Sequence, residues 1–500
     1  MDVQSLTPLL AIVIPLAGAA LIAVAGKRPN VRDAISVSCA VLQFGAVAAM
    51  LGRVRAGDTL RYTLLSFIPE VAIALRVDAL GILFAAVASF LWIPTVVYAI
   101  GYMRALQEHH QTRFYVFLSL SLTATLGVAF AANLVTLYLF YEVLTLTTYP
   151  LVTHAQTPEA SKGGQRYLFY QLGTGIVFLL PAILLTFTHS GTFEFRPGGV
   201  FPAEAGHRML LVVYLLFLFG IAKAAIMPFH AWLPAAMVAP TPVSALLHAV
   251  AVVNAGVFAL LRVMLDVFGE ARMRALDLGA ITLVVASFTI LMASAYALRL
   301  DNLKLLLAYS TIGQLSYMLL GAALLSPAGM VGGVVHLVNH SVSKITLFFC
   351  AGAIYIASRK TLISELTGIG KVMPLTLGAF TIGALSIVGL PPTAGFVTKW
   401  HLVVGALEAD RVLVLLVVVV STLMSAAYYL PIVGRAFFRQ PADPHPQSGA
   451  RLFPLAASRA GEGSALILVP LLATAVLTVI LGLYSRPLLD LVRQALGWRP

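Results

Sequence analysis

Residues 220–234 read GIAKAAIMPFHAWLP, a stretch in which Lys223 lies inside a long apolar run and two prolines follow it. A proline inside a helix removes a backbone hydrogen bond and frees a carbonyl group. A charge at the centre of a bilayer costs roughly 3 kcal/mol on insertion scales, so an ionisable residue there is a candidate functional site. The stretch therefore predicts a membrane helix that is broken close to a buried lysine.

A second stretch has the same design. Residues 389–400 read GLPPTAGFVTKW, and Lys399 lies within about two helical turns of the paired prolines. Broken helices in corresponding positions of two halves of a chain are typical of inverted-repeat transporters. We therefore predict an all-α polytopic membrane protein with two broken helices and two inverted repeats. The expected units are N-terminal membrane helices over 1–110, inverted repeats over 111–265 and 275–440, and a C-terminal membrane helix over 460–500.

Composition places the chain in a membrane. Hydrophobic residues make up 60% of the 500 residues and charged residues 10%, whereas soluble proteins carry about 25% charged residues. Runs of about 20 apolar residues, long enough to cross the hydrocarbon layer, recur along the chain. We expect about fourteen spans, near residues 7–25, 33–52, 78–103, 114–130, 132–153, 166–188, 208–238, 243–264, 278–299, 302–322, 328–357, 372–407, 411–438 and 464–488.

The net charge of +12 comes from single Lys and Arg residues in short loops, a pattern that indicates membrane orientation and not nucleic-acid binding. Loop charges favour both termini outside, with the polar stretch 439–463 on the cytoplasmic surface of the inner (plasma) membrane. The first apolar run lacks a basic segment before it and is expected to be a retained helix. Cys39 and Cys350 lie in separate spans, which argues against a disulfide framework or an iron–sulfur site.

Glu142 lies in the apolar stretch 132–151. Burial favours the neutral form of an amine, and a nearby carboxylate favours the charged form. Movement of Glu142 towards or away from Lys223 would therefore switch the lysine between holding and releasing a proton. The alternative is a static ion pair that joins two helices.

His336, His340 and Lys344 recur at i, i+4 and i+8 and so form one stripe on a helix. Because histidine exchanges protons near pH 6.5, this stripe could relay protons through intervening waters. One alternative is polar contact between helices, worth about 0.6 kcal/mol per bond. A second is metal binding by the His-x-x-x-His spacing, which here lacks an internal Glu and a third ligand.

Lys304 and Lys399 are two further candidates. Lys304 begins a helix near Ser310 and Gln314, which fall on roughly the same face and could hold waters. Lys399 precedes Trp400, a residue type common at membrane interfaces. For both lysines the competing interpretation is a side chain that reaches to the membrane surface.

Six ordered segments resemble the antiporter-like subunits that respiratory complex I, membrane-bound hydrogenases and Mrp-type cation/proton antiporters share. They span roughly residues 75–440 and comprise YEV at 141–143, 222–234, APTPVSALLH at 239–248, 301–314, the stripe His336, His340 and Lys344, and 389–399. The resemblance implies that the two inverted repeats are five-helix units that each form a half-channel, with a polar axis at the membrane midplane and no redox chemistry in this chain. No cofactor or metal is expected. It implies proton-translocating roles for Glu142, Lys223, His248, Lys304, His336, His340, Lys344 and Lys399.

The chain departs from the resembled pattern in two places. Many members carry a lysine where this chain has Asn254, so His248 would carry that relay step alone. The chain also ends soon after the last span, which fits the D-type subunit of an Mrp complex better than the long complex I subunit with its lateral helix. The resemblance implies partners: other membrane subunits, including homologous antiporter-like ones, the lipid bilayer, H+ and, in an Mrp complex, Na+.

The function expected from these features is proton translocation within a multi-subunit membrane complex, with the D-type subunit of an Mrp-type Na+/H+ antiporter first. The alternatives are a proton-pumping subunit of a complex I-like NADH:quinone oxidoreductase or hydrogenase, and a scaffold subunit without transport. An independent solute carrier is disfavoured because the sequence shows no polar pocket for an organic substrate.

Overall fold

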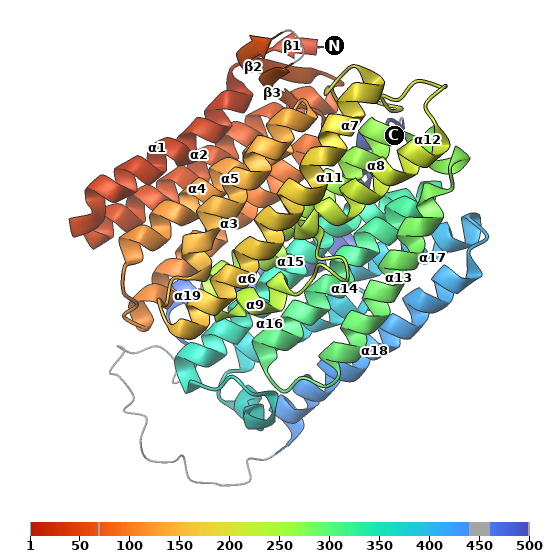
Figure 1. Cartoon of the computed structure of the whole chain (residues 1–500). Helices are drawn as coiled ribbons and strands as arrows, with labels where there is room; N and C mark the ends of the chain where they lie inside the picture. Colours follow the sequence, from red (N-terminus) through yellow and green to blue (C-terminus); the bar gives the residue numbers. More distant parts are fainter. Residues whose placement is uncertain (1, 69–70, 440–460, 499–500) are drawn as a thin grey trace.

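The computed structural model describes residues 2–68, 71–439 and 461–498, and most of them are helical (Figure 1). The helices are α1 (Thr7–Val24), α2 (Pro29–Arg55), α3 (Ala79–Ala105), α4 (Gln111–Ala129), α5 (Leu134–Val152), α6 (Pro158–Thr174), α7 (Leu180–Ser190), α8 (His207–Gly220), α9 (Trp232–Ala235), α10 (Thr241–Ala249), α11 (Val252–Arg262), α12 (Glu270–Ala275), α13 (Leu278–Ala297), α14 (Leu303–Ala323), α15 (Pro327–Ser358), α16 (Pro374–Val388), α17 (Ala394–Glu408), α18 (Val412–Phe438), α19 (Ala465–Leu483) and α20 (Arg486–Ala495). Short 3₁₀ turns cover Ala25–Lys27, Ala222–Ala224, Ala236–Val238, Ile363–Leu366 and Ile369–Lys371, and π-helical segments cover Gly175–Leu179 and Val263–Phe268. The strands are β1 (Asp2–Gln4), β2 (Thr59–Ile68) and β3 (Val71–Val77).

Within the described residues, 12 helices are long and apolar enough to cross a membrane. Each overlaps one of the unbroken spans expected from the sequence. The two spans that remain, near 208–238 and 372–407, are the broken ones, and α8 and α16 form their first halves. The all-α polytopic fold is therefore confirmed, and the helices are consistent with the expected number of spans. The division into inverted repeats stays a prediction.

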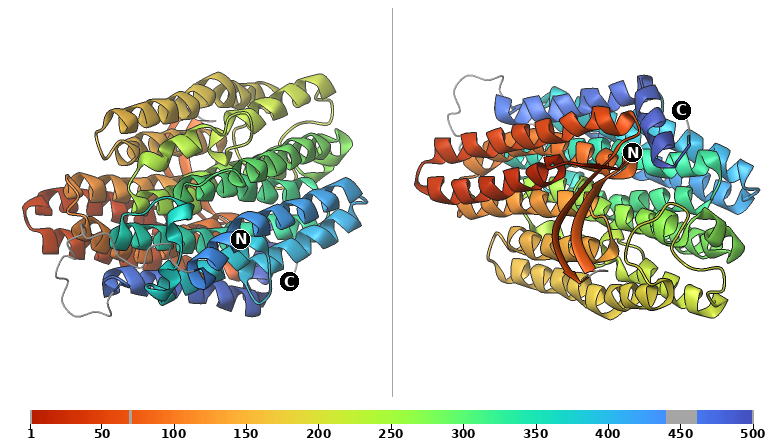
Figure 2. Two further views of the ribbon diagram at one scale, coloured as in Figure 1. Left: turned by 90° about the horizontal axis from the view of Figure 1, so that it is seen from below. Right: turned by 90° about the horizontal axis from the view of Figure 1, so that it is seen from above.

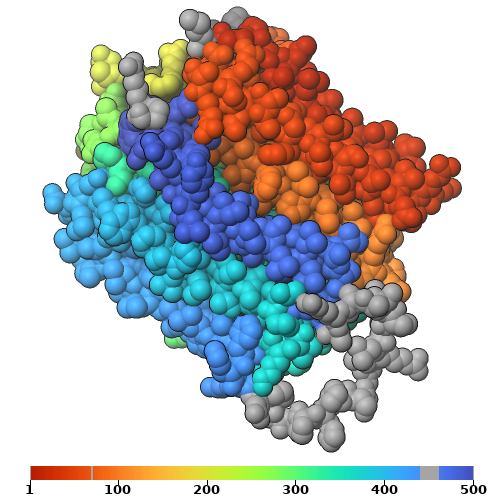
Figure 3. All heavy atoms as spheres, turned by 180° about the vertical axis from the view of Figure 1, so that it is seen from behind, coloured from red at the N-terminus to blue at the C-terminus, as the bar shows by residue number. Residues whose placement is uncertain are grey.

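Helix α15 occupies the middle of the bundle, with α1 to α5 on one side and α13, α17 and α18 on the other (Figure 1). It packs against α3, α10, α14, α16, α17 and α19. Views from below and from above show the N-terminal helices at one side of the molecule, and the view from above shows the strands lying across the helices (Figure 2). From behind, the last two helices, α19 and α20, run across the molecule. They lie between the N-terminal helices, in red and orange, and the cyan to light-blue helices that precede residue 440 (Figure 3). One long helix thus lies within reach of both halves.

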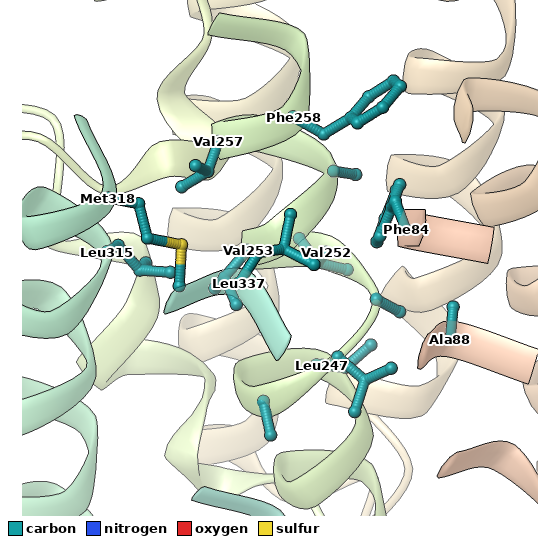
Figure 4. Close-up of a cluster of buried hydrophobic side chains, with 14 of the residues drawn as sticks. Phe84, Ala88, Leu247, Val252, Val253, Val257, Phe258, Leu315, Met318 and Leu337 are labelled. Atoms are coloured by element: carbon teal, nitrogen blue, oxygen red, sulfur yellow. The ribbon is translucent and has the colours of Figure 1, made fainter. Parts of the chain in front are cut away.

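The span made by α10 and α11 is enclosed on every side, and the apolar stretch of it that is long enough to cross a membrane is 100% buried. A helix that is apolar all round is expected in the interior of a large bundle. Its Leu247, Val253 and Phe258 pack against Phe84 of α3 and Met318 of α14 in one apolar cluster (Figure 4). Any polar side chain on this span is therefore held deep inside the protein.

The strands were not expected, because only helices were predicted over the first hundred residues. β2 pairs antiparallel with β3 and parallel with β1 in one sheet. The β2 sequence TLRYTLLSFI is rich in the β-branched, aromatic and apolar residues that favour strands.

The last expected span, 464–488, is too long, because α19 ends at Leu483 and the separate helix α20 follows. The predicted cytoplasmic stretch 439–463 falls mostly on 440–460, outside the described residues.

Candidate functional site

The helix break around Lys223 begins where α8 ends at Gly220. Lys223 lies in the 3₁₀ turn Ala222–Ala224, and Ala225 takes a left-handed conformation with φ 54°. The indole N–H of Trp232 donates a 2.8 Å hydrogen bond to the carbonyl of Ala222. Non-helical backbone at membrane depth needs such partners, because no bulk water is available there. The proline-rich sequence thus forms a break that a buried tryptophan stabilises.

The ammonium of Lys223 is fully buried and held by residues of α5. Its Nζ donates to Thr145 Oγ1 at 2.6 Å and lies 3.4 Å from the centroid of the Tyr141 ring. The backbone N–H of Lys223 also donates to the Tyr141 hydroxyl, at 3.2 Å. A hydroxyl oxygen and an aromatic face both stabilise a cation. Neither Thr145 nor Tyr141 was singled out from the sequence.

Glu142 lies on the same helix, between these two residues. Both of its carboxylate oxygens are buried and have no hydrogen-bond partner among the described residues. In the part of the chain that the structure describes, no ion pair within 4.0 Å joins Glu142 to Lys223. The static ion pair is therefore not formed in this conformation, although the two side chains belong to one polar cluster.

His248 lies on α10, deep in the bundle. Both of its ring nitrogens lack a protein hydrogen-bond partner among the described residues. Its ring centroid is 6.2 Å from that of Trp232 in the Lys223 break and 6.1 Å from that of Phe348 on α15. His248 thus lies between the first half of the chain and the central helix.

A third interruption follows His248, between the end of α10 and the start of α11. The sequence did not predict it. The Asn254 side-chain N–H donates to the carbonyl of Ala249 at 3.1 Å and to Ser341 Oγ at 2.7 Å. Asn254 cannot titrate, but it partners a carbonyl at this interruption and links α11 to α15.

The stripe predicted on α15 is present and fully buried. His336 Nε2 lies 3.0 Å from Gln314 Oε1, and its Nδ1 lies 3.1 Å from Thr398 Oγ1. The ring centroids of His336 and His340 are 5.9 Å apart. The ring nitrogens of His340 have no partner among the described side chains and backbone. The spacing therefore brings the two imidazoles together as expected.

Lys344 extends this stripe towards α18. Its Nζ donates to the carbonyl of Leu307 and to the hydroxyl of Tyr429, both at 3.1 Å. The Tyr429 hydroxyl donates in turn to Ser310 at 3.0 Å, and Tyr428 donates to the same oxygen at 3.2 Å. Neither Tyr428 nor Tyr429 was assigned a role from the sequence, so these partners of the lysine were missed.

Lys399 turns inward from α17 and is 7% exposed. Its Nζ donates to the carbonyl of Val388, just before the second break, at 2.9 Å, and to Thr422 at 2.7 Å. Gly389 follows with φ +88°, and a Cβ at that position would lie 2.5 Å from Lys399 Cδ. Only glycine gives this turn room for the lysine stem. The inward amine contradicts the alternative in which Lys399 reaches to the surface.

Lys304 lies near the start of α14. Its Nζ donates to the carbonyl of Ala239 at 2.7 Å. The side chain lines a cavity of about 440 Å³ that Tyr102, Glu108 and Lys360 also line. Lys304 therefore connects the start of α14 with the segment that leads into α10.

A buried charge cluster near the start of α3 was also missed. Asp78 accepts hydrogen bonds from Arg262 at 2.5 Å and from Arg76 at 2.7 Å, and Arg262 bonds Asp266 at 2.7 Å. Burial alone would raise the pKa of Asp78, but the guanidinium groups of Arg262 and Arg76 hold it well below its ordinary value. The contact between Asp78 and Arg262 joins residues that are far apart in the chain, and sequence spacing does not reveal it.

Replacing Arg262 by Met is expected to destabilise the protein by about 3–5 kcal/mol, because Asp78 and Asp266 would lose a buried partner. The melting temperature of the purified protein in detergent measures this effect. Because the pKa of folded Asp78 is lowered, the stabilisation is present at neutral pH and is lost only as the pH falls below the ordinary carboxyl range.

Arg493→Met is the matched control, since Arg493 forms an exposed 3.5 Å ion pair with Asp490. Such a pair contributes at most about 1 kcal/mol. Equal melting temperatures for the Arg262→Met variant and this control would contradict a stabilising role for the cluster.

The site residues do not form a metal centre. Within residues 2–68, 71–439 and 461–498, no group of three or more His, Cys, Asp or Glu side chains could hold a metal ion. The two ring nitrogens of His336 lie within hydrogen-bond distance of Gln314 and Thr398. The site residues are buried amines and imidazoles with hydroxyl partners, groups that can hold and exchange protons.

Comparison with known proteins agrees with this architecture. Residues 131–425 match the model of the family described as NADH:quinone oxidoreductase/Mrp antiporter, TM. The NADH-quinone oxidoreductase subunit N of Desulforudis audaxviator is 32% identical over 514 residues, covering 98% of this chain and 99% of that protein. The probable A/B subunit of a K(+)/H(+) antiporter from Rhizobium meliloti is 31% identical over 448 residues, and the match covers 86% of this chain but 44% of that longer protein.

A chain of the solved Mrp complex from Dietzia sp. has the same fold, with a TM-score of 0.86 at 24% identity over 98% of this chain and 96% of that one. The resemblance to antiporter-like subunits, which the six sequence segments indicated, is confirmed. Because the family model covers more than half of the chain and one relative matches nearly all of it, the chain belongs to the NADH:quinone oxidoreductase/Mrp antiporter family of transmembrane proteins.

Proposed function

We propose that this chain is a proton-translocating, antiporter-like subunit of a multi-subunit membrane complex. The observation that carries the proposal is Lys223, a fully buried amine at a helix break, held by α5 beside an unpaired carboxylate. A charge at membrane depth is costly, so its presence indicates use. No redox or organic-substrate chemistry is needed for this role.

The first half of the path depends on the pair Glu142 and Lys223. An amine in a low-dielectric site favours its neutral form, and an approaching carboxylate favours the charged form. Thr145 holds the ammonium at 2.6 Å while the carboxylate is apart. Closing the pair would load the lysine with a proton, and opening it would release that proton.

The second half continues through His248 to the stripe on α15. The ring nitrogens of His248 and His340 have no partner among the described residues, and such buried polar groups can bond water. Lys344, His340 and His336 then lie in order along α15, and His336 contacts Thr398 on the helix that carries Lys399. We propose that 111–265 and 275–440 form two half-channels joined along this line, with Lys304 at its edge.

Glu142→Gln tests the proposal. Glutamine keeps the shape but cannot attract or hold a proton, so proton flux is expected to fall by about 10²-fold, the lower end for a positioned proton-transfer group. The measurement uses the complete complex in vesicles that contain a pH-sensitive dye. Glu159→Gln is the control, because Glu159 is an exposed glutamate at the start of α6. Normal flux in Glu142→Gln, with normal assembly, would favour a scaffold without transport.

Two host complexes are supported by different observations. The full-length match to a subunit N supports a redox-driven NADH-quinone oxidoreductase in which this chain pumps protons. The match to a K(+)/H(+) antiporter protein supports an Mrp-type antiporter, and for that host we propose the D-type subunit of a Na+/H+ exchanger. Both hosts imply other membrane subunits as partners, and we propose the inner (plasma) membrane as the location.

The composition of the purified complex separates the two hosts. Bound flavin and iron–sulfur clusters in partner subunits, with quinone-dependent proton uptake, would identify the redox-driven complex. Their absence, together with proton movement that depends on a Na+ gradient, would identify the antiporter.

A further inference from the structure

The carboxylate of Glu142 lies directly over Gly175 of the neighbouring span. A Cβ placed on Gly175 would be 2.0 Å from Glu142 Oε1 and 3.1 Å from its Cδ. Real Cβ atoms do not approach other atoms at 2.0 Å. The carboxylate therefore occupies space that any side chain at position 175 would fill.

In this position the carboxylate makes no ion pair within 4.0 Å with Lys223 among the described residues. The Glu142 oxygens have no hydrogen-bond partner among the described residues, and the Lys223 ammonium bonds Thr145 instead. Thr145 lies three residues after Glu142 on α5, so a change in the Glu142 side chain alone can exchange one partner of the lysine for another. The structure thus holds the pair in its open arrangement.

The segment that begins at Gly175 contacts Glu142 and the end of α8, the helix that precedes Lys223. Gly175 begins the π-helical segment that ends at Leu179. A Cβ on Gly220, the last residue of α8, would lie 2.5 Å from the backbone nitrogen of Leu179. The π segment therefore meets the carboxylate at its first residue and the chain that leads into Lys223 at its last. Single-turn π segments inside α-helices occur frequently at functional sites.

We propose that Gly175 is a positioning residue. Because it has no side chain, it leaves the space that the Glu142 carboxylate occupies when the pair with Lys223 is open. The inference rests on the proposed proton-translocating function and deepens it. A side chain at position 175 fills this space, so the carboxylate must stay near Lys223 or move elsewhere. Either change stops the alternation between the open and closed pair.

Gly175→Ala is compared with Gly173→Ala, since a Cβ on Gly173 has nothing within 4 Å. Both glycines belong to the same span, so loss of helix flexibility affects them alike. Proton flux of the complete complex in dye-loaded vesicles is expected to fall at least five-fold in Gly175→Ala and to stay at the wild-type level in Gly173→Ala. Wild-type flux in Gly175→Ala would overturn the proposal.

Glu142→Asp shows whether the effect acts through the carboxylate. The shorter side chain withdraws the oxygens by one methylene, so Gly175→Ala should change neither the flux nor the melting temperature of the complex in this background. An equal loss in both backgrounds would mean that position 175 serves helix packing, which overturns the proposal. If Gly175→Ala prevents assembly, restored assembly in the double variant supports the proposal and continued failure overturns it.

The outcomes separate this inference from the function on which it rests. If Glu142→Gln transports normally, the proposed function fails. If Glu142→Gln loses flux while Gly175→Ala transports normally, only the role of Gly175 fails.

Discussion

Replacing Lys223 by alanine is expected to lower proton flux through the complex by about 10²-fold or more, the range that a positioned proton donor or acceptor contributes. Lys223 is the buried amine at the first helix break, and its Nζ bonds Thr145 and contacts the Tyr141 ring. Alanine removes the proton carrier and leaves Thr145 without its donor. Dye-loaded vesicles that contain the complete complex measure the loss.

Lys162→Ala is the matched control for this variant. Lys162 is an exposed lysine on α6, so its loss changes the charge of the chain in the same way without touching the axis. Its flux should equal that of the wild type. The amount of complex in the membrane shows whether Lys223→Ala still assembles. Normal assembly with normal flux would mean that the lysine has a structural role.

Lys344→Met is expected to reduce flux to a similar degree, because the second half of the path also passes through a buried amine. The Lys344 ammonium is fully buried and bonds the Leu307 carbonyl and the Tyr429 hydroxyl. Methionine has a similar length and no charge, and replacing a buried charge by an apolar side chain is often neutral or stabilising. The variant should therefore assemble well and conduct poorly, which a purely structural lysine would not produce.

Lys371→Met serves as its control, since Lys371 is exposed after the end of α15. Flux in this control should be unchanged. A Lys344→Met variant that conducts like the wild type would remove the stripe on α15 from the proton path and leave it as polar contact between helices.

The membrane helices could be predicted because each needs a long apolar run, and such runs can be read directly from the sequence. The breaks at Lys223 and before Lys399 could be predicted because prolines mark them. The interruption before α11 could not, since it has no proline or glycine and depends on Asn254 bonding Ala249 and Ser341. The strands were missed because the sequence was searched for apolar runs of about 20 residues, and β2 and β3 are only 10 and 7 residues long.

In the candidate site, too, some features could be predicted from the sequence and others could not. The stripe on α15 follows from helical spacing, so His336, His340 and Lys344 could be placed on one face before the structure was known. The partners of the lysines could not, because Tyr429 and Thr145 reach them from other helices. Gly175 has no side chain that could take part in chemistry, and only the clash that a Cβ there would make with Glu142 Oε1 points to the role proposed for it.

The most direct test of one continuous proton path compares the Lys223→Ala and Lys344→Met variants with the double variant. If both amines lie in series on a single line, each single substitution reduces proton flux in vesicles as far as the double substitution does. If each half conducts independently, each single variant keeps about half of the flux and only the double variant loses it. Half of the flux in each single variant, or wild-type flux in the double variant, would contradict a single continuous proton path.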